Sequence, residues 1–167
     1  CMSVAVREHD GMYIYTKGAF DVIAEHCTHY RENGSVYPLT PAKKQRFKEE
    51  NDRLASQAMR VIGFAYRPIA QFSEEIAETS LILVGLCGMI DPPRKEAFSA
   101  VAKCRRAGIR PVMITGDHKL TAKAIAEQLR IYHDGDRILT GSELERLTDE
   151  QLDQVIDDTS VFARVSP

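Results

Sequence analysis

The tripeptide Thr115-Gly116-Asp117 has the residue types most suited to chemistry, and it directly follows an apolar run at residues 109–114. A hydroxyl and a backbone N–H at a strand-to-helix turn suit a phosphate oxygen, and the dipole of the following helix favours an anion there. In open α/β sheets, ligands collect beyond the carboxyl ends of the strands. A plain turn is the alternative, with positive φ at Gly116 and with Asp117 as the N-cap of the next helix. The residues alone leave both interpretations open.

Three more positions could meet a ligand. Lys17 precedes Gly18, so a lysine could lie along an aromatic base while the glycine lets a flat ligand approach the backbone. A surface lysine beside a turn glycine is the alternative. Arg60 enters an apolar run and could reach a phosphate, or it could be an edge-strand arginine with a packed stem. Arg164 lies inside an apolar stretch, where a charge needs a ligand or an ion-pair partner.

Several classes of site are not indicated. The five histidines show no metal-ligand spacing, so we expect no metal site. We find no Ser-His-Asp or Cys-His arrangement. Neither G-x-x-x-x-G-K-[ST] nor G-x-G-x-x-G is present, so the common nucleotide-binding loops are not signalled.

The composition is that of a soluble globular protein of one ordinary domain or two small ones. The chain has 167 residues, of which 44% are hydrophobic and 28% charged. A net charge of -2 argues against a nucleic-acid partner. The longest apolar run, residues 81–90, is about half of what a membrane-spanning helix needs. The four cysteines are widely spaced, which predicts reduced thiols in the cytosol.

The first half of the chain predicts strands and helices in alternation. Asp10-Gly11 separates two β-rich runs and is a strong hairpin signal. Thr40-Pro41 has an N-cap residue followed by a first-turn proline. We expect strands at 4–6, 12–15, 60–66 (ended by Pro68) and 81–89, helices from Phe20 and over 41–59, a loop over 30–40 (with Asn33-Gly34 and Pro38), and a loop or single helical turn over 72–79.

The second half follows Asp91-Pro92-Pro93-Arg94, where consecutive prolines hold the chain extended and predict a domain boundary. We expect helices at 95–107 (ended by Gly108), at 120–129, from Ser142 with Glu145 in a capping box, and from Thr148. We expect strands at 109–114, 138–141 and 161–165. From Leu81 onward, strands that alternate with helices in this way predict parallel βαβ units.

Together these stretches resemble the cytoplasmic catalytic region of P-type cation-transporting ATPases, most closely the type II group that includes calcium pumps. The strings that carry the resemblance are Met2-Ser-Val, Lys17-Gly-Ala19, Arg60-Val-Ile62, Val84-Gly-Leu-Cys-Gly-Met-Ile-Asp-Pro-Pro-Arg-Lys-Glu96, Met113-Ile-Thr-Gly-Asp117 and Phe162-Ala-Arg-Val165. They come in the family's order and span nearly the whole chain.

The resemblance implies an α/β fold in two parts. Residues 1–90 would be the C-terminal half of the nucleotide-binding domain, with a mixed or antiparallel sheet and helices. The hinge would be Asp91, Pro92, Pro93 and Arg94. Residues 95–167 would be part of a haloacid-dehalogenase-like, parallel α/β phosphorylation domain.

The resemblance also implies an ATP site. Lys17 would lie against the adenine, with Gly18 close by and Ile62 lining the base or ribose. Arg60 would meet the middle phosphates. Thr115 and Gly116 would hold the terminal phosphate, and Asp117 and Arg164 would lie toward the ribose and hinge.

Two motifs of that family are missing from this sequence. The phosphorylated aspartate of Asp-Lys-Thr-Gly-Thr and the magnesium-binding Gly-Asp-Gly-x-Asn-Asp are absent, so we expect no catalytic residue and no Mg²⁺ ligand here. The chain alone would not hydrolyse ATP. It begins at Cys1, and we expect a soluble piece of the cytoplasmic portion of an integral membrane pump, with the rest of that pump as its partner.

Exposed strand edges around residues 4–15 and in the second half also predict self-association. One alternative function is a soluble haloacid-dehalogenase-like phosphatase or regulatory domain. It needs an Asp-x-Asp nucleophile after an early strand, but Asp134-Gly-Asp136 comes downstream of Thr115. A purely structural role is the third alternative and predicts no response to ATP near Lys17 and Arg60.

Overall fold

The computed structural model describes residues 1–72 and 78–165, so the predicted loop at 72–79 lies largely outside the described residues. The chain forms two compact units. The first comprises Cys1–Arg53 and Val61–Met89, and the second comprises Leu54–Arg60 and Ile90–Pro167. Each unit has its own sheet, and each is described by itself.

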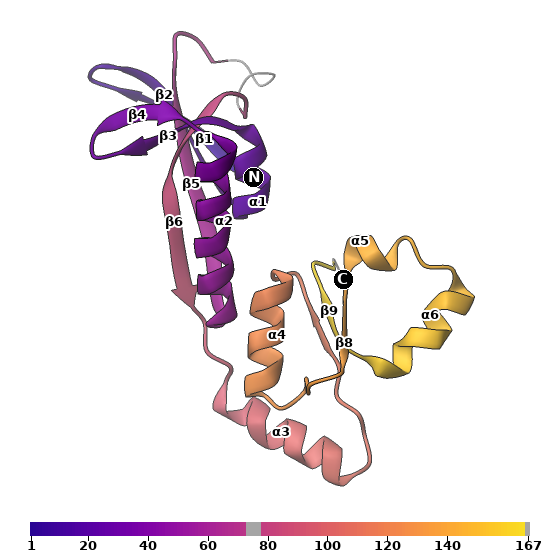
Figure 1. Cartoon of the computed structure of the whole chain (residues 1–167). Coiled ribbons are helices and arrows are strands. Elements are labelled where there is room, and N and C mark those ends of the chain that lie inside the picture. Colours follow the sequence, from indigo (N-terminus) through magenta and orange to yellow (C-terminus); the bar gives the residue numbers. More distant parts are fainter. Residues whose placement is uncertain (73–77, 166–167) are drawn as a thin grey trace. The chain divides into compact units, whose positions relative to one another are not determined.

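The first unit is built on a six-stranded mixed sheet in the order β1-β2-β5-β6-β3-β4 (Figure 1). Its elements are β1 (Met2–Glu8), β2 (Gly11–Gly18), α1 (Phe20–His26), β3 (Cys27–Glu32), β4 (Ser35–Pro38), α2 (Pro41–Ser56), β5 (Met59–Ile69) and β6 (Leu81–Ile90). β2 runs antiparallel to both β1 and β5, whereas β3 runs parallel to β6. The expected α/β fold with a mixed, mostly antiparallel sheet and helices is confirmed.

Side chains alternate between a buried face and an open face of this sheet, as the period of two in a strand requires. Ala65, Leu81 and Leu83 are buried in a core with Phe20 and Ile23 of α1. Residues of the opposite parity, such as Phe64 and Val84, remain 40% and 49% exposed. The sheet therefore has a helix-packed face and an open face that is rich in large apolar side chains.

Two predictions for the first unit are wrong. The expected loop at 30–40 is instead a hairpin of β3 and β4. Asn33 and Gly34, at φ 50° and 83°, form the tight turn that joins these strands. Pro68 does not end its strand, because β5 continues to Ile69 and Pro68 lies opposite Tyr13. The predicted hairpin at Asp10-Gly11 is confirmed by the β1–β2 pairing.

The strand edges differ in part from expectation. β1 is at one end of the strand order, whereas β2 lies between β1 and β5 and is not an edge. Met2 and Val4 on β1 are 59% and 53% exposed. Self-association through this edge remains a prediction.

The second unit contains a three-stranded, fully parallel sheet in the order β7-β9-β8. Its elements are α3 (Lys95–Arg106), β7 (Met113–Thr115), α4 (Lys119–Gln128), β8 (Arg137–Thr140), α5 (Gly141–Leu144), α6 (Asp149–Val155), η2 (Ile156–Asp158) and β9 (Thr159–Ala163). Ala122 and Ala126 of α4 pack against Val161 and Ala163 of β9, and Figure 1 shows the helix beside the sheet. The predicted parallel pairing is confirmed for these strands, whereas β6 belongs to the other sheet.

Three details of the second unit correct the sequence-based expectations. β7 has only three residues, since its pairing with β9 begins at Met113 and the preceding Pro111 cannot donate to a ladder. The capping box uses Thr140 and Glu143, so α5 starts earlier than the predicted Ser142. Arg164 lies just beyond β9, at φ 51°, and is exposed rather than enclosed in a strand.

The segment from Asp91 to Arg94 has no regular secondary structure and connects β6 to α3. Asp91, Pro92 and Arg94 are exposed, and Arg94 takes the N-cap position of α3 in an extended conformation. This geometry agrees with the restriction that Pro92 and Pro93 place on the backbone. A hinge role for these four residues remains a prediction.

Candidate functional site

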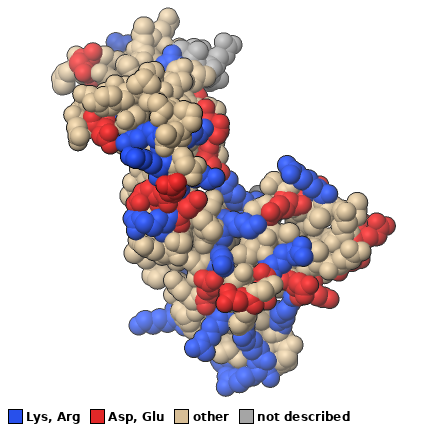
Figure 2. All heavy atoms as spheres, viewed as in Figure 1, with Lys and Arg blue, Asp and Glu red and all other residues tan. Residues whose placement is uncertain are grey.

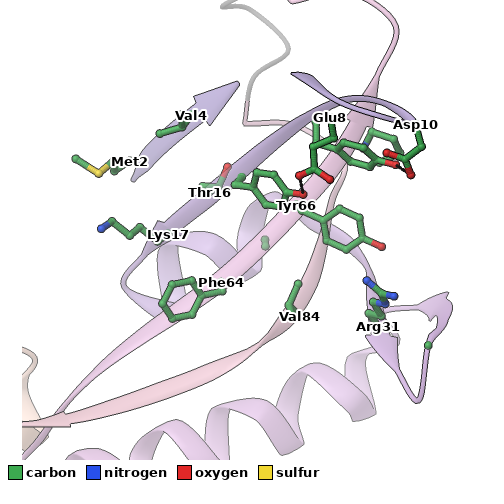
Figure 3. A pocket seen from close by; sticks show the side chains of 15 residues that line it. Met2, Val4, Glu8, Asp10, Thr16, Lys17, Arg31, Phe64, Tyr66 and Val84 are labelled. Atoms are coloured by element: carbon green, nitrogen blue, oxygen red, sulfur yellow. Dashed lines mark hydrogen bonds between the residues drawn. The ribbon is translucent and has the colours of Figure 1, made fainter. Parts of the chain in front are cut away.

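Lys17 lies on the open face of the six-stranded sheet, beside a cavity of about 940 Å³ (Figure 3). Its neighbours follow from strand register. Met2 of β1 and Phe64 of β5 lie directly opposite Lys17, so the three side chains form one row across the sheet. A lysine flanked by an aromatic ring and a thioether offers a cation beside a flat apolar surface. Such a surface can accept the face of an aromatic ring.

The next rows of the open face are tyrosines. Tyr15 lies opposite Tyr66 with ring centroids 6.4 Å apart, and Tyr13 stacks on Tyr15 at 6.1 Å. The Tyr15 hydroxyl donates to Glu8 Oε1 over 2.5 Å, and this bond raises the pKa of Tyr15 to about 12. The hydrogen bond to Asp10 likewise raises the pKa of Tyr13. Both hydroxyls therefore bond to carboxylates, and the rings form one aromatic surface on the open face.

Gly18 lies opposite Gly63, so two neighbouring strands lack side chains at the same level. The space there is already tight on one side. A Cβ on Gly18 would lie 3.3 Å from Cys1 Cα, and one on Gly63 would lie 3.4 Å from Phe20 Cα. Ile62 is half-buried in β5, and by strand alternation it shares the open face with Phe64. Lys17 and Ile62 thus belong to the same face.

The second group of candidate residues is the turn after β7. Asp117 N–H donates to Thr115 Oγ1 over 3.1 Å, and that hydroxyl donates to Asp117 Oδ2 over 3.0 Å. Each residue therefore fixes the other, and the turn presents the exposed Gly116 between them. A hydroxyl and backbone amides held in this way at the carboxyl end of a parallel strand are suited to binding a phosphate.

The plain-turn interpretation fails in both of its specific features. Gly116 does not have a positive φ, so conformational freedom does not explain a glycine there. The N-cap of α4 is His118 rather than Asp117, because His118 Nδ1 accepts from Leu120 N–H over 3.3 Å. The Asp117 carboxylate is therefore not used to cap α4.

Arg60 belongs to the second unit, where its Nε lies 4.0 Å from Asp117 Oδ1. The arginine side chain is 69% exposed and the aspartate 27%, so this ion pair contributes little stability in water. It does place a guanidinium beside the turn. The carboxylate provides the orientation, and an anion could use the remaining donors of the guanidinium.

Arg164 contacts the turn through its backbone. Its N–H donates to the Asp117 carbonyl over 3.1 Å, and the next N–H, that of Val165, donates to the Thr115 carbonyl over 3.3 Å. The backbone after β9 thus holds both ends of the turn. These backbone bonds do not indicate whether the Arg164 side chain points toward a ligand.

The structure thus groups the candidate residues in two sets. Lys17, Gly18 and Ile62 belong to the first unit, and Arg60, Thr115, Gly116, Asp117 and Arg164 belong to the second. Sequence reasoning missed the other side chains of the open face, namely Met2, Tyr15, Phe64 and Tyr66. Counting alternate residues outward from Lys17 and along 60–66 would have found them.

Other chemistry receives little support. Among residues 1–72 and 78–165, no three His, Cys, Asp or Glu side chains come together as metal ligands. Asp136 precedes β8 rather than following a strand, and its carboxylate accepts from the buried Ser160 hydroxyl over 2.6 Å and from His133 N–H over 2.9 Å. These bonds lower the pKa of Asp136. Its place at the amino end of a parallel strand does not suit the Asp-x-Asp nucleophile of a phosphatase.

The mixed charge of the surface and the length and polarity of the helices agree with what the composition predicts. On the face shown in Figure 2, acidic and basic side chains are interspersed, with Lys and Arg gathered over α3. In the described part of the chain, each helix is too short or too polar to cross a membrane.

Comparison with known proteins gives a consistent result. The family model for P-type ATPase, cytoplasmic domain N, matches residues 1–96. The calcium-transporting ATPase of Bacillus subtilis is 45% identical over 170 residues, which cover 99% of this chain and 19% of that protein. Calcium-transporting ATPase 1 of Lactococcus lactis is 41% identical over 157 residues, covering 92% of this chain and 18% of that protein. The sodium/potassium-transporting ATPase subunit alpha-2 of Gallus gallus is 34% identical over 205 residues. The chain thus spans 18% to 19% of the length of the first two relatives.

Proposed function

Because this chain belongs to the family of P-type cation-transporting ATPases, we propose that it binds ATP as part of a membrane pump that couples ATP hydrolysis to cation transport. The observation that carries the proposal is the row of Met2, Lys17 and Phe64 on an open sheet face, in the unit that the family model matches. Several relatives are calcium-transporting ATPases, so calcium is the cation that we propose.

In this proposal the open face binds the base. The ammonium group of Lys17 and the ring of Phe64 contact the adenine, and Ile62 covers one edge of the base or ribose. Gly18 lies next to Lys17 in the same strand, but a side chain at Gly18 or Gly63 would point to the helix-packed face, away from the base. Stacking of a base on an aromatic side chain contributes about 1–3 kcal/mol, so this face alone gives only weak binding.

The turn after β7 binds phosphate in the same proposal. The hydroxyl of Thr115 and the backbone at Gly116 meet the terminal phosphate, while the guanidinium of Arg60 meets the middle phosphates. Asp117 holds Thr115 and orients Arg60, as its distances to both groups support. Charge-assisted hydrogen bonds from an arginine are about twice as strong as neutral ones.

We also propose the division of the chain into domains. Residues 1–90 are the C-terminal half of a nucleotide-binding domain, Asp91 to Arg94 are the hinge, and residues 95–167 are part of a haloacid-dehalogenase-like domain. The parallel order β7-β9-β8, with the turn at its carboxyl end, supports the last assignment.

Phosphoryl transfer itself is not assigned to this chain. Its sequence has no Asp-Lys-Thr-Gly-Thr and no Gly-Asp-Gly-x-Asn-Asp. The acidic residues of the described segments do not form a magnesium cage, so these residues do not fit the metal that the family uses. The role of this chain is to bind and orient the nucleotide, and the rest of the pump is its partner.

The proposal is tested by calorimetric titration of the chain with ATP, adenosine and inorganic triphosphate. We expect ATP and adenosine to bind through the base contacts, and ATP and triphosphate to bind through the phosphate contacts. Lys17→Ala should lower the affinity for ATP and for adenosine, and it should leave the affinity for triphosphate unchanged. Val36→Ala, on the exposed part of β4, is the control and should change none of them. A structural or interaction-only role predicts no heat with any of the three ligands.

A further inference from the structure

Gly141, the first residue of α5, is packed against the backbone that follows β9. A Cβ built on Gly141 would lie 2.5 Å from the Arg164 carbonyl oxygen and 3.4 Å from the Arg164 carbonyl carbon. Real Cβ atoms do not approach an oxygen so closely, because C···O contacts are about 3.3 Å or longer. The contact is with main chain, so a change of side-chain rotamer cannot relieve it.

The need for glycine here is one of space, not of backbone conformation. The glycines with positive φ are 11, 34, 108 and 135, and Gly141 is not among them. Any residue could adopt its backbone angles. The Arg164 carbonyl oxygen excludes a side chain, whereas Val165 Cγ1, at 3.6 Å from the Cβ position, is at an ordinary contact distance.

The same short backbone segment holds the Thr115-Gly116-Asp117 turn. The N–H groups of Arg164 and Val165 donate to the carbonyls of Asp117 and Thr115. The Val165 carbonyl also lies 3.9 Å from the position that a Cβ on Gly116 would take. The Arg164–Val165 segment therefore contacts Gly141 through the Arg164 carbonyl, and it holds the turn through its two N–H groups.

We propose that Gly141 is a positioning residue for the phosphate-binding turn, acting through the backbone of Arg164 and Val165. This inference rests on the proposed function of the turn. A methyl group at position 141 would push the Arg164 carbonyl by about 0.8 Å, the difference between a C···O contact of about 3.3 Å and the 2.5 Å available. The hydrogen bonds of 3.1 and 3.3 Å from that segment to the turn have little room for such a shift.

α5 is well suited to resist the push. Its N-terminus is fixed by a capping box in which Thr140 Oγ1 accepts from Glu143 N–H, and Glu143 Oε2 accepts from Thr140 N–H over 2.7 Å. Lys119 Nζ also contacts Glu143 Oε1 at 3.2 Å. Because these bonds fix the first turn of α5 around position 141, we expect the segment of Arg164 and Val165 to move.

The test compares Gly141→Ala with Gly85→Ala in the full 167-residue chain. Gly85 is the matched control, because a Cβ there meets nothing within 4 Å and its φ is not positive. The first measurement is amide hydrogen exchange without any nucleotide. We expect the Arg164 and Val165 amides of Gly141→Ala to exchange about tenfold faster, as loss of one backbone hydrogen bond predicts, while the amides of β8 and α4 keep their protection. Gly85→Ala should leave all of these amides unchanged.

The second measurement is the ratio of ATP affinity to ADP affinity. This ratio measures how much the terminal phosphate of ATP contributes to binding. In Gly141→Ala we expect this ratio to fall toward one, with adenosine binding unchanged. Unchanged exchange at Arg164 and Val165 would overturn the positioning role, whether or not the chain binds ATP. Equal loss of protection across β8, β9 and α4 would also overturn it, since it would show a general packing role. If the wild type does not distinguish ATP from ADP, the proposed phosphate site fails, and the exchange experiment still decides the role of Gly141.

Discussion

Replacing Thr115 by alanine removes a hydroxyl that stabilises the turn and that, in our proposal, binds the terminal phosphate. The hydroxyl accepts from Asp117 N–H and donates its one proton to Asp117 Oδ2, and in our proposal that proton turns to the terminal phosphate when ATP binds. Thr115→Ser keeps the hydroxyl and loses only a methyl group, so it is the matched control.

The expected size of the effect follows from these bonds. A neutral intramolecular hydrogen bond contributes about 0.5–1.5 kcal/mol and one to a charged group about 1.5–3 kcal/mol, so losing the bond from Asp117 N–H and the bond to its carboxylate should lower the free energy of unfolding of the second unit by about 2–4 kcal/mol. A hydrogen bond to a charged group contributes about 1.5–3 kcal/mol, and a loss of about 2 kcal/mol lowers the ATP affinity about thirtyfold. ADP lacks the third (γ) phosphate, which is the group that Thr115 would contact in ATP. The affinity for ADP should therefore change by less than about threefold.

The assay is calorimetric titration of wild type, Thr115→Ala and Thr115→Ser with ATP and with ADP. Urea unfolding of each variant shows whether the chain remains folded. We expect the serine variant to retain most of the ATP affinity. An equal loss for ATP and ADP, or no loss for either, would refute the assignment of Thr115 to the terminal phosphate.

Other expected outcomes concern the base site, a buried thiol and the acid limit of stability. Lys17→Ala should weaken ATP and adenosine by the same factor of about two to five, as an exposed cation–π contact predicts, and unequal factors in titrations would contradict a contact with the base. Burial raises the pKa of Cys27 to about 11, so at pH 8 its thiol should resist iodoacetamide while the exposed Cys87 reacts; equal alkylation in mass spectra would show that the core is open. Hydrogen bonds from Thr140 lower the pKa of Glu143, and those from Ser160 and His133 lower that of Asp136. The stability from both carboxylates is therefore present above their unfolded pKa values near about 4 and is lost as pH falls through the lower folded values. Thermal melting should show this loss, and Asp136→Asn should flatten it.

Local signals in the sequence predicted much of the fold. Asp10-Gly11, Thr148 and Gly108 each have one dominant conformational preference, and a hairpin, a helix N-cap and a helix C-terminus are found at these positions. Asn33-Gly34 carried an equally good hairpin signal, but Pro38 and the polar residues nearby favoured a loop. Strand pairing of β3 with β6 across a long separation decided the outcome.

The candidate site was predicted less completely, for a physical reason. Motifs mark residues that are close in sequence, such as Thr115 and Asp117, whereas rows across a sheet depend on register. The register that brings Met2 and Phe64 beside Lys17 is set by three strands far apart in the chain. The close approach of Gly141 to Arg164 also depends on tertiary packing, and the sequence alone carries no sign of it.

The most direct test of ATP binding is a titration of the ¹⁵N-labelled chain with ATP and with adenosine, followed by amide chemical shifts. We predict that ATP shifts the amides of Lys17, Gly18 and Ile62 together with those of Thr115, Gly116 and Asp117. Adenosine should shift only the first group. ATP that leaves both groups unchanged at millimolar concentration would contradict the proposed function.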